Sequence, residues 1–197
     1  MGPLARRAQA GLVTVVGLVA VMWAVFVLDA ALGNLLMRTL AIAPRRVDGL
    51  DGVLFSPFLH GGIQHLVGNT LPLLVLGFLA FLEGARRFAV AVGTSWLASG
   101  IGAWLFGGGL TIGASGVVFG LFTYLIARGF YNRDWKQILL AVVLFAAYGS
   151  ILWGILPRFG SNISWQAHLF GALGGILAAF LLKRKRSVPG GTDRFTA

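Results

Sequence analysis

The stretch Gly107-Gly-Gly-Leu-Thr-Ile-Gly-Ala-Ser115-Gly-Val-Val-Phe-Gly-Leu-Phe-Thr-Tyr-Leu-Ile-Ala127 decides the fold of this chain. Its second half, from Ser115 to Ala127, is mostly apolar and favours a helix. At about 1.5 Å per residue this helix rises only about 18 Å, whereas the hydrocarbon core of a bilayer is about 30 Å thick. We therefore expect a short helix that begins inside the membrane, after irregular backbone that protein buries or water reaches.

The composition also indicates a membrane protein. Of the 197 residues, 57% are hydrophobic and 11% are charged, with a mean hydropathy of +0.85, whereas soluble domains carry about 25% charged residues. The net charge is +10, but the basic residues lie between long apolar runs, where they mark cytoplasmic loops rather than a nucleic-acid surface. The absence of cysteine excludes disulfides and thiolate chemistry.

The apolar segments predict six transmembrane helices in one bundle, of which the fourth is the short one. The segments are roughly 11–32, 66–82, 88–106, 115–127, 137–156 and 165–182. The first follows Arg6 and Arg7 as a signal peptide would, but its apolar core is too long and no cleavage site follows, so we expect a retained anchor. The predicted domain is 10–184, between cytoplasmic tails at 1–9 and 185–197.

The basic residues orient this bundle, because Lys and Arg collect on the cytoplasmic side. With the N-terminus inside, the inner segments hold Arg6, Arg7, Arg86, Arg87, Arg128, Arg133, Lys136, Lys183, Arg184, Lys185, Arg186 and Arg194. The outer segments hold only Arg38, Arg45, Arg46 and Arg158. This asymmetry predicts a multi-pass protein of the plasma membrane with both termini in the cytoplasm.

Polar side chains from three of the predicted helices fall at one depth. Counted from the inner helix ends, Ser115 lies about 18 Å up, His168 about 21 Å and Asn69 about 20 Å. His65 precedes Asn69 by four residues and so lies on the same helix face, one turn higher. Ionisable or strongly polar groups in such segments are functional candidates.

These residue types match the needs of nucleophilic catalysis. A serine hydroxyl requires a neighbouring base, which the His168 imidazole can supply. The oxyanion of a tetrahedral intermediate requires fixed donors, and the helix N-terminus at Ser115 offers free amides, with Asn69 and His65 as further donors. The last apolar segment carries no Asp or Glu, so the residues predict a dyad rather than a triad.

Each piece taken alone also has a purely structural interpretation. Gly-Ala-Ser-Gly in a membrane helix is more often a site of close packing, and a single membrane His or Asn often makes an interhelical hydrogen bond. Glycines spaced by four residues, Gly116 with Gly120 and Gly171 with Gly175, predict bare stripes where two helices approach closely.

Taken together, the motifs resemble the rhomboid family of intramembrane proteases, over about residues 10–184. The first motif is His60-Gly-Gly-Ile-Gln-His65-Leu-Val-Gly-Asn69. The second is Gly113-Ala-Ser115-Gly116, which matches Gly-x-Ser-Gly, and the third is His168-Leu-Phe-Gly171-Ala-Leu-Gly-Gly175, which matches His-x-x-Gly-x-x-x-Gly.

The resemblance implies that Ser115 attacks and that His168 is first the base and then the acid. It implies that His65, Asn69 and the backbone from Gly113 to Ser115 line the oxyanion hole. It further implies substrates that are transmembrane segments of other proteins, cut near the outer face within the lipid bilayer, without a metal or organic cofactor. The oligomeric state is left open.

The resemblance also implies supporting residues, and the sequence departs from the family pattern at some of them. The supporting residues are His60, Phe119, Gly116, Gly171 and Gly175. Phe119 stands where bacterial members often have Tyr, so it keeps a ring to stack on the catalytic histidine but loses the hydroxyl.

Two other functions compete with proteolysis. An inert rhomboid-like protein that binds membrane clients would typically lack the Ser or the His, and this chain has both. A small transporter would use the glycine-rich helices as a path, but the chain shows no inverted repeats and almost no intramembrane carboxylates. Metal and aspartyl intramembrane proteases are disfavoured, because His-Glu-x-x-His and a pair of membrane aspartates are both absent from the sequence.

Overall fold

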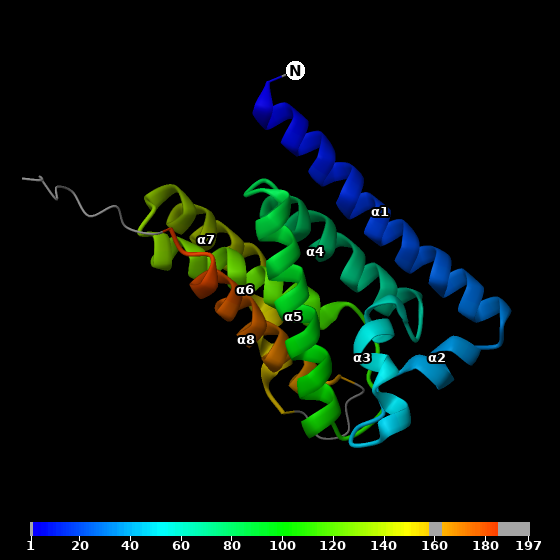
Figure 1. Ribbon diagram of the computed structural model, residues 1–197. Coiled ribbons are helices and arrows are strands. Elements are labelled where there is room, and N and C mark those ends of the chain that lie inside the picture. Colours follow the sequence, from blue (N-terminus) through cyan, green and yellow to red (C-terminus); the bar gives the residue numbers. More distant parts are fainter. Residues whose placement is uncertain (1, 158–162, 185–197) are drawn as a thin grey trace, which may run out of the picture.

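The computed structural model describes residues 2–157 and 163–184, and these residues form helices joined by turns and short loops (Figure 1). The α-helices are α1 Pro3–Ala31, α2 Leu35–Leu40, α3 Asp51–Phe55, α4 Ile63–Phe81, α5 Ala85–Phe106, α6 Ser115–Asn132, α7 Trp135–Tyr148 and α8 Trp165–Leu181. Three 3-10 helices complete the described fold, η1 Val47–Gly49, η2 Ser56–Phe58 and η3 Gly149–Ile155.

Several of these helices are suited to a membrane. Among the described residues, α1, α4, α5 and the run Trp135–Ile155, which joins α7 to η3, are long and apolar enough to span a bilayer. The α8 helix is apolar but shorter, with 17 residues. All of them overlap segments predicted from the sequence, which confirms an all-helical chain with several candidate membrane helices.

The first helix begins before the predicted start of the domain at residue 10. Residues 3–9, expected as a tail, are the first turns of α1. Pro3 occupies a first-turn position, where its missing amide costs nothing and its fixed φ favours the helix. The tail predicted for 185–197 lies outside the described residues.

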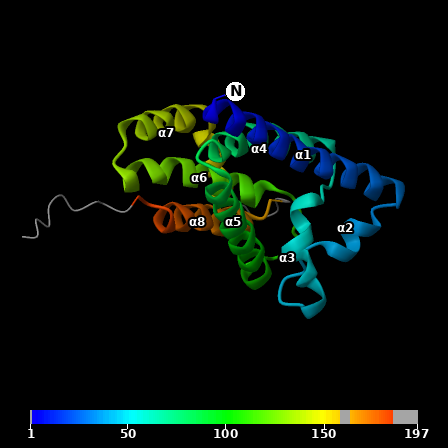
Figure 2. The ribbon, with the colours of Figure 1, turned by 45° about the horizontal axis from the view of Figure 1, so that its top comes forward.

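The central helix α6 is longer than predicted. It runs for 18 residues rather than ending at Ala127, a rise of about 27 Å. The sequence placed Arg128 in a cytoplasmic loop, but its side chain is only 6% exposed and its Nη1 lies 3.0 Å from Glu83 Oε1. Because this ion pair compensates the charge, the helix continues past it. Helices α4, α5, α7 and α8 all contact α6, which lies between α7 and α8 in both views (Figures 1 and 2).

Glycines bring α6 and α8 into backbone contact, as their spacing predicted. A Cβ added to Gly171 would overlap the carbonyl of Gly116, and one added to Gly175 would overlap the carbonyl of Gly120. An added Cβ on Gly116 would also overlap the side chain of Ser99 from α5. Without side chains at these crossings, the three helices approach closely enough for dispersion contacts to hold them together.

The segment between α1 and α4 is folded rather than a plain loop. Asp29 near the end of α1 is buried, and its carboxylate accepts the amides of Leu36 and Met37 at the start of α2. Farther along, the Val53 carbonyl accepts the Trp96 indole N–H at 2.8 Å, which fastens this segment to α5.

This segment covers the start of α6. Gly116 lies beside Ser99, and α5 continues from Ser99 to Phe106, a further rise of about 10 Å. The first residue of α6 therefore lies well below the end of α5. Because α6 has 18 residues, its length alone does not require it to begin inside the bilayer, and that expectation stays a prediction.

Candidate active site

The turn before α6 holds Ser115 in place. Gly113 has a φ of +106°, a conformation that glycine adopts readily and other residues rarely do. Its amide donates to the Ser56 carbonyl at 2.8 Å, and Thr111 forms a short antiparallel bridge with Ile42. The irregular backbone that precedes Ser115 thus finds its hydrogen bonds in the segment between α1 and α4.

Ser115 and His168 are in hydrogen-bond contact. His168 Nε2 lies 2.8 Å from Ser115 Oγ, although 53 positions separate them in the chain. The contact depends on the crossing of α8 with α6 at Gly171 and Gly116. Counting helix rise from Ala127 uses the wrong inner end, because α6 ends at Asn132. The Ser115 and His168 side chains nevertheless lie at the same depth, since they are in contact.

Two groups fix the orientation of the His168 ring. The Phe119 ring stacks on it, with 4.2 Å between centroids and 9° between planes. On the far side of the ring, Nδ1 lies 3.0 Å from the carbonyl oxygen of Gly154. Since a carbonyl only accepts, this contact favours the tautomer with the proton on Nδ1, in which Nε2 presents a lone pair to the Ser115 hydroxyl. This is the tautomer that a general base requires.

His65 and Asn69 lie against the turn that precedes Ser115. A Cβ added to Gly113 would lie 2.5 Å from His65 Nε2 and 3.7 Å from Asn69 Nδ2. Asn69 is only 3% exposed and donates to the carbonyl of His65 at 3.0 Å. An amide group has two N–H donors, so Asn69 has one more to offer.

The Gly113 amide has a backbone partner. It donates to the Ser56 carbonyl at 2.8 Å, and the role predicted for Gly113 in the oxyanion hole stays a prediction. Gly113 also makes room for His65. The first turn of α6 leaves its amides, those of Ser115 and Gly116 among them, without intrahelical acceptors, so backbone donors remain at the start of this helix.

His60 lies behind His65. Their rings meet edge to face, with centroids 5.0 Å apart. Nδ1 of His60 lies 3.3 Å from the Phe58 carbonyl, while Nε2 has no partner among the described residues. Burial, and secondarily the charge of His65, lowers the pKa of His60 to about 4, so the ring is neutral at physiological pH and supports His65 without adding charge.

Sequence reasoning missed two groups at the site. They are the carbonyls of Gly154 and Ser56, which hold His168 and Gly113. Every residue has a carbonyl, so neither position carries a signal in the side-chain pattern. The one signal in the sequence is that residue 154 is a glycine, which allows the His168 and Phe119 rings to approach its backbone closely.

Comparisons with known proteins identify the family that the sequence matches. The sequence model of the family described as Rhomboid domain matches residues 49–185. An uncharacterized protein of Mycobacterium tuberculosis is 42% identical over 178 residues, which cover 86% of this chain and 74% of the relative. YdcA of Bacillus subtilis, a candidate rhomboid protease, is 31% identical over 68% of each chain. RHOMBOID-like protein 4 of Arabidopsis thaliana is 30% identical over 69% of this chain and 35% of its own length.

Proposed function

The chain belongs to the rhomboid domain family, and from that premise we propose that it is an intramembrane serine endopeptidase with Ser115 as nucleophile and His168 as base. The observation that carries the proposal is the 2.8 Å contact between His168 Nε2 and Ser115 Oγ. A general base must lie within about 2.6–3.2 Å of the heavy atom whose proton it removes. The distance from His168 Nε2 to Ser115 Oγ meets this requirement.

The reaction follows from these positions. The Ser115 hydroxyl proton moves to His168 Nε2 as Oγ bonds to the carbonyl carbon of the scissile peptide. The resulting oxyanion accepts from His65, Asn69 and the free amides at the start of α6. The C–N bond then breaks, and the Nε2 proton passes to the leaving amine. Water, activated by the same base, hydrolyses the acyl ester and restores the free hydroxyl.

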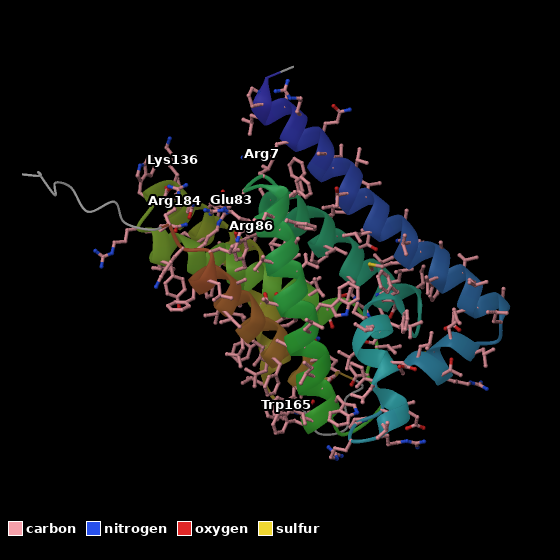
Figure 3. The ribbon with its side chains drawn as sticks, viewed as in Figure 1. Arg7, Glu83, Arg86, Lys136, Trp165 and Arg184 are labelled. Atoms are coloured by element: carbon pink, nitrogen blue, oxygen red, sulfur yellow. The ribbon has the colours of Figure 1, made fainter. Side chains whose placement is uncertain are left out.

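The proposed setting is the plasma membrane, crossed six times by α1, α4, α5, α6, α7 with η3, and α8. Arg7, Arg86, Lys136 and Arg184 gather at one end of the molecule, and Trp165 lies at the other (Figure 3). The basic end suits the cytoplasm, so the proposed orientation puts the start of α1 and the end of α8 on that side. The substrates are transmembrane segments, cleaved near the outer face where α6 begins.

The test is covalent labelling of purified protein by a fluorophosphonate, together with cleavage of a model transmembrane substrate. We expect the wild type to react, and Ser115→Ala and His168→Ala to lose both activities while remaining folded, because the dyad acts as a unit. Ser150→Ala, which removes an exposed serine of η3, is the matched control and should react normally.

Retention of cleavage by either dyad variant would refute the proposal. A folded wild type that neither reacts with the probe nor cleaves would instead favour an inert rhomboid-like protein that binds membrane clients.

A further inference from the structure

We propose that Gly154 is a positioning residue, whose carbonyl selects the tautomer and direction of the His168 base. The inference rests on the proposed function, because it concerns how that base is held. It starts from the 3.0 Å contact between the Gly154 oxygen and His168 Nδ1, on the side of the ring opposite Ser115.

The contact matters because the neutral imidazole has a single N–H. If the proton were on Nε2, the ring could not accept the Ser115 proton, and the nucleophile would stay inactive. In a triad, a carboxylate prevents this by accepting from Nδ1. No carboxylate is paired with His168 among the described residues, so the Gly154 carbonyl takes that place.

Glycine is needed at position 154 for a steric reason. An added Cβ would lie 3.0 Å from His168 Nδ1 and 3.0 Å from Phe119 Cζ. Both distances are tighter than ordinary van der Waals contact, and both neighbours are rings held in a stack. A side chain here would therefore push the carbonyl away from Nδ1, tilt the imidazole, or do both.

The Gly154 carbonyl and the His168 ring that it contacts belong to different helices. Gly154 lies in η3, which continues α7, whereas His168 belongs to α8. The η3 helix packs on α8, whereas α7 packs on α6 and on η3. The activity of the base thus depends on η3 staying in place against α8.

The test compares Gly154→Ala with Gly149→Ala, a matched change in the same 3-10 helix. The atoms nearest to an added Cβ at Gly149 belong to the Phe145 ring, at an ordinary 3.5 Å. We expect Gly154→Ala to lower kcat by about 10- to 100-fold, since a misplacement of about 1 Å can cost roughly 100-fold, while KM changes less than about twofold. Fluorophosphonate labelling should slow by a similar factor. Gly149→Ala should stay within about twofold of wild type.

A spectroscopic measurement separates positioning from a merely structural effect. The chain has three histidines, so ring ¹⁵N spectra of labelled protein are simple, and His168→Ala identifies the signals of that residue. The wild type should show His168 protonated on Nδ1 at neutral pH. Gly154→Ala should show a mixture of tautomers, and Gly149→Ala should not.

The outcomes are distinct. A wild-type His168 protonated on Nε2 overturns the inference, and so does Gly154→Ala with the labelling rate and tautomer of Gly149→Ala. If the wild type neither labels nor cleaves, the proposed function fails, and the ring spectra alone then decide whether Gly154 orients His168. If Gly154→Ala does not fold, the wild-type spectrum still tests the inference, because protonation of His168 on Nε2 would overturn it.

Discussion

At the scale of single residues, the candidate site is built around glycines rather than around charges. Gly113 turns the chain into α6 and leaves room for His65, and Gly154 lets a carbonyl reach His168. The polar groups that remain are neutral donors and acceptors. This suits a site inside a membrane protein, where an unpaired charge is expensive.

Asn69 allows a test of the oxyanion hole. We expect Asn69→Ala to lower kcat by about 10²–10³-fold with KM little changed, because one oxyanion donor of several is lost. Asn69→Asp keeps the shape but replaces the donor with an acceptor, so its loss should be at least as large. Steady-state kinetics on a transmembrane substrate measure both variants. A rise in KM at unchanged kcat would instead make Asn69 a substrate-binding residue.

At the scale of helices, the contact between base and nucleophile follows from the crossing of α6 with α8. Both helices present backbone to one another at the pairs Gly116 with Gly171 and Gly120 with Gly175. In lipid, apolar burial does not drive helices together, so close packing of this kind is the main attraction between them.

Gly171→Val tests the crossing without touching a catalytic atom. The new side chain meets the Gly116 carbonyl, so α8 must move away and the Ser115 contact must break. We expect cleavage and fluorophosphonate labelling to fall by at least about 100-fold, along with a lower thermal unfolding midpoint. The matched control is Gly93→Val on α5, where an added Cβ meets nothing within 4 Å. Folded Gly171→Val protein with both activities near wild type would show that the crossing does not hold the dyad.

At the scale of the whole molecule, the two ends differ in chemistry. The basic side chains labelled in Figure 3 crowd the end where α1 and α7 begin and where α8 finishes. The opposite end is made by α2, α3 and the end of α5 (Figure 1). The side of the membrane that each end faces therefore decides from which side Ser115 is reached.

Cysteine labelling measures this orientation, because the chain has no native cysteine. Val47→Cys lies at the end near Ser115 and is 83% exposed in the wild type, so an impermeant thiol reagent should label it on intact cells. Lys136→Cys, exposed at the basic end, should label only after permeabilisation. The reverse pattern would place the opening of the site on the cytoplasmic side.

The sequence by itself determined the class of fold and the family. Apolar runs of nearly spanning length predict helices whatever their neighbours, because a bilayer leaves the backbone few alternatives. The three motifs around Asn69, Ser115 and His168 each lie within a short stretch of sequence, so they were readable without any tertiary contact. The glycine stripes were also readable from the sequence, because each consists of glycines four residues apart in the chain.

Only the tertiary structure decided how these parts meet. The length of α6 depends on the pairing of Arg128 with Glu83 from the turn between α4 and α5, and an isolated helix pattern cannot reveal a distant counter-charge. The use of the Gly113 amide and the orientation of His168 depend on the carbonyls of Ser56 and Gly154. Backbone groups are the same in every residue, so which carbonyl serves the site is decided by packing in space and not by the sequence pattern.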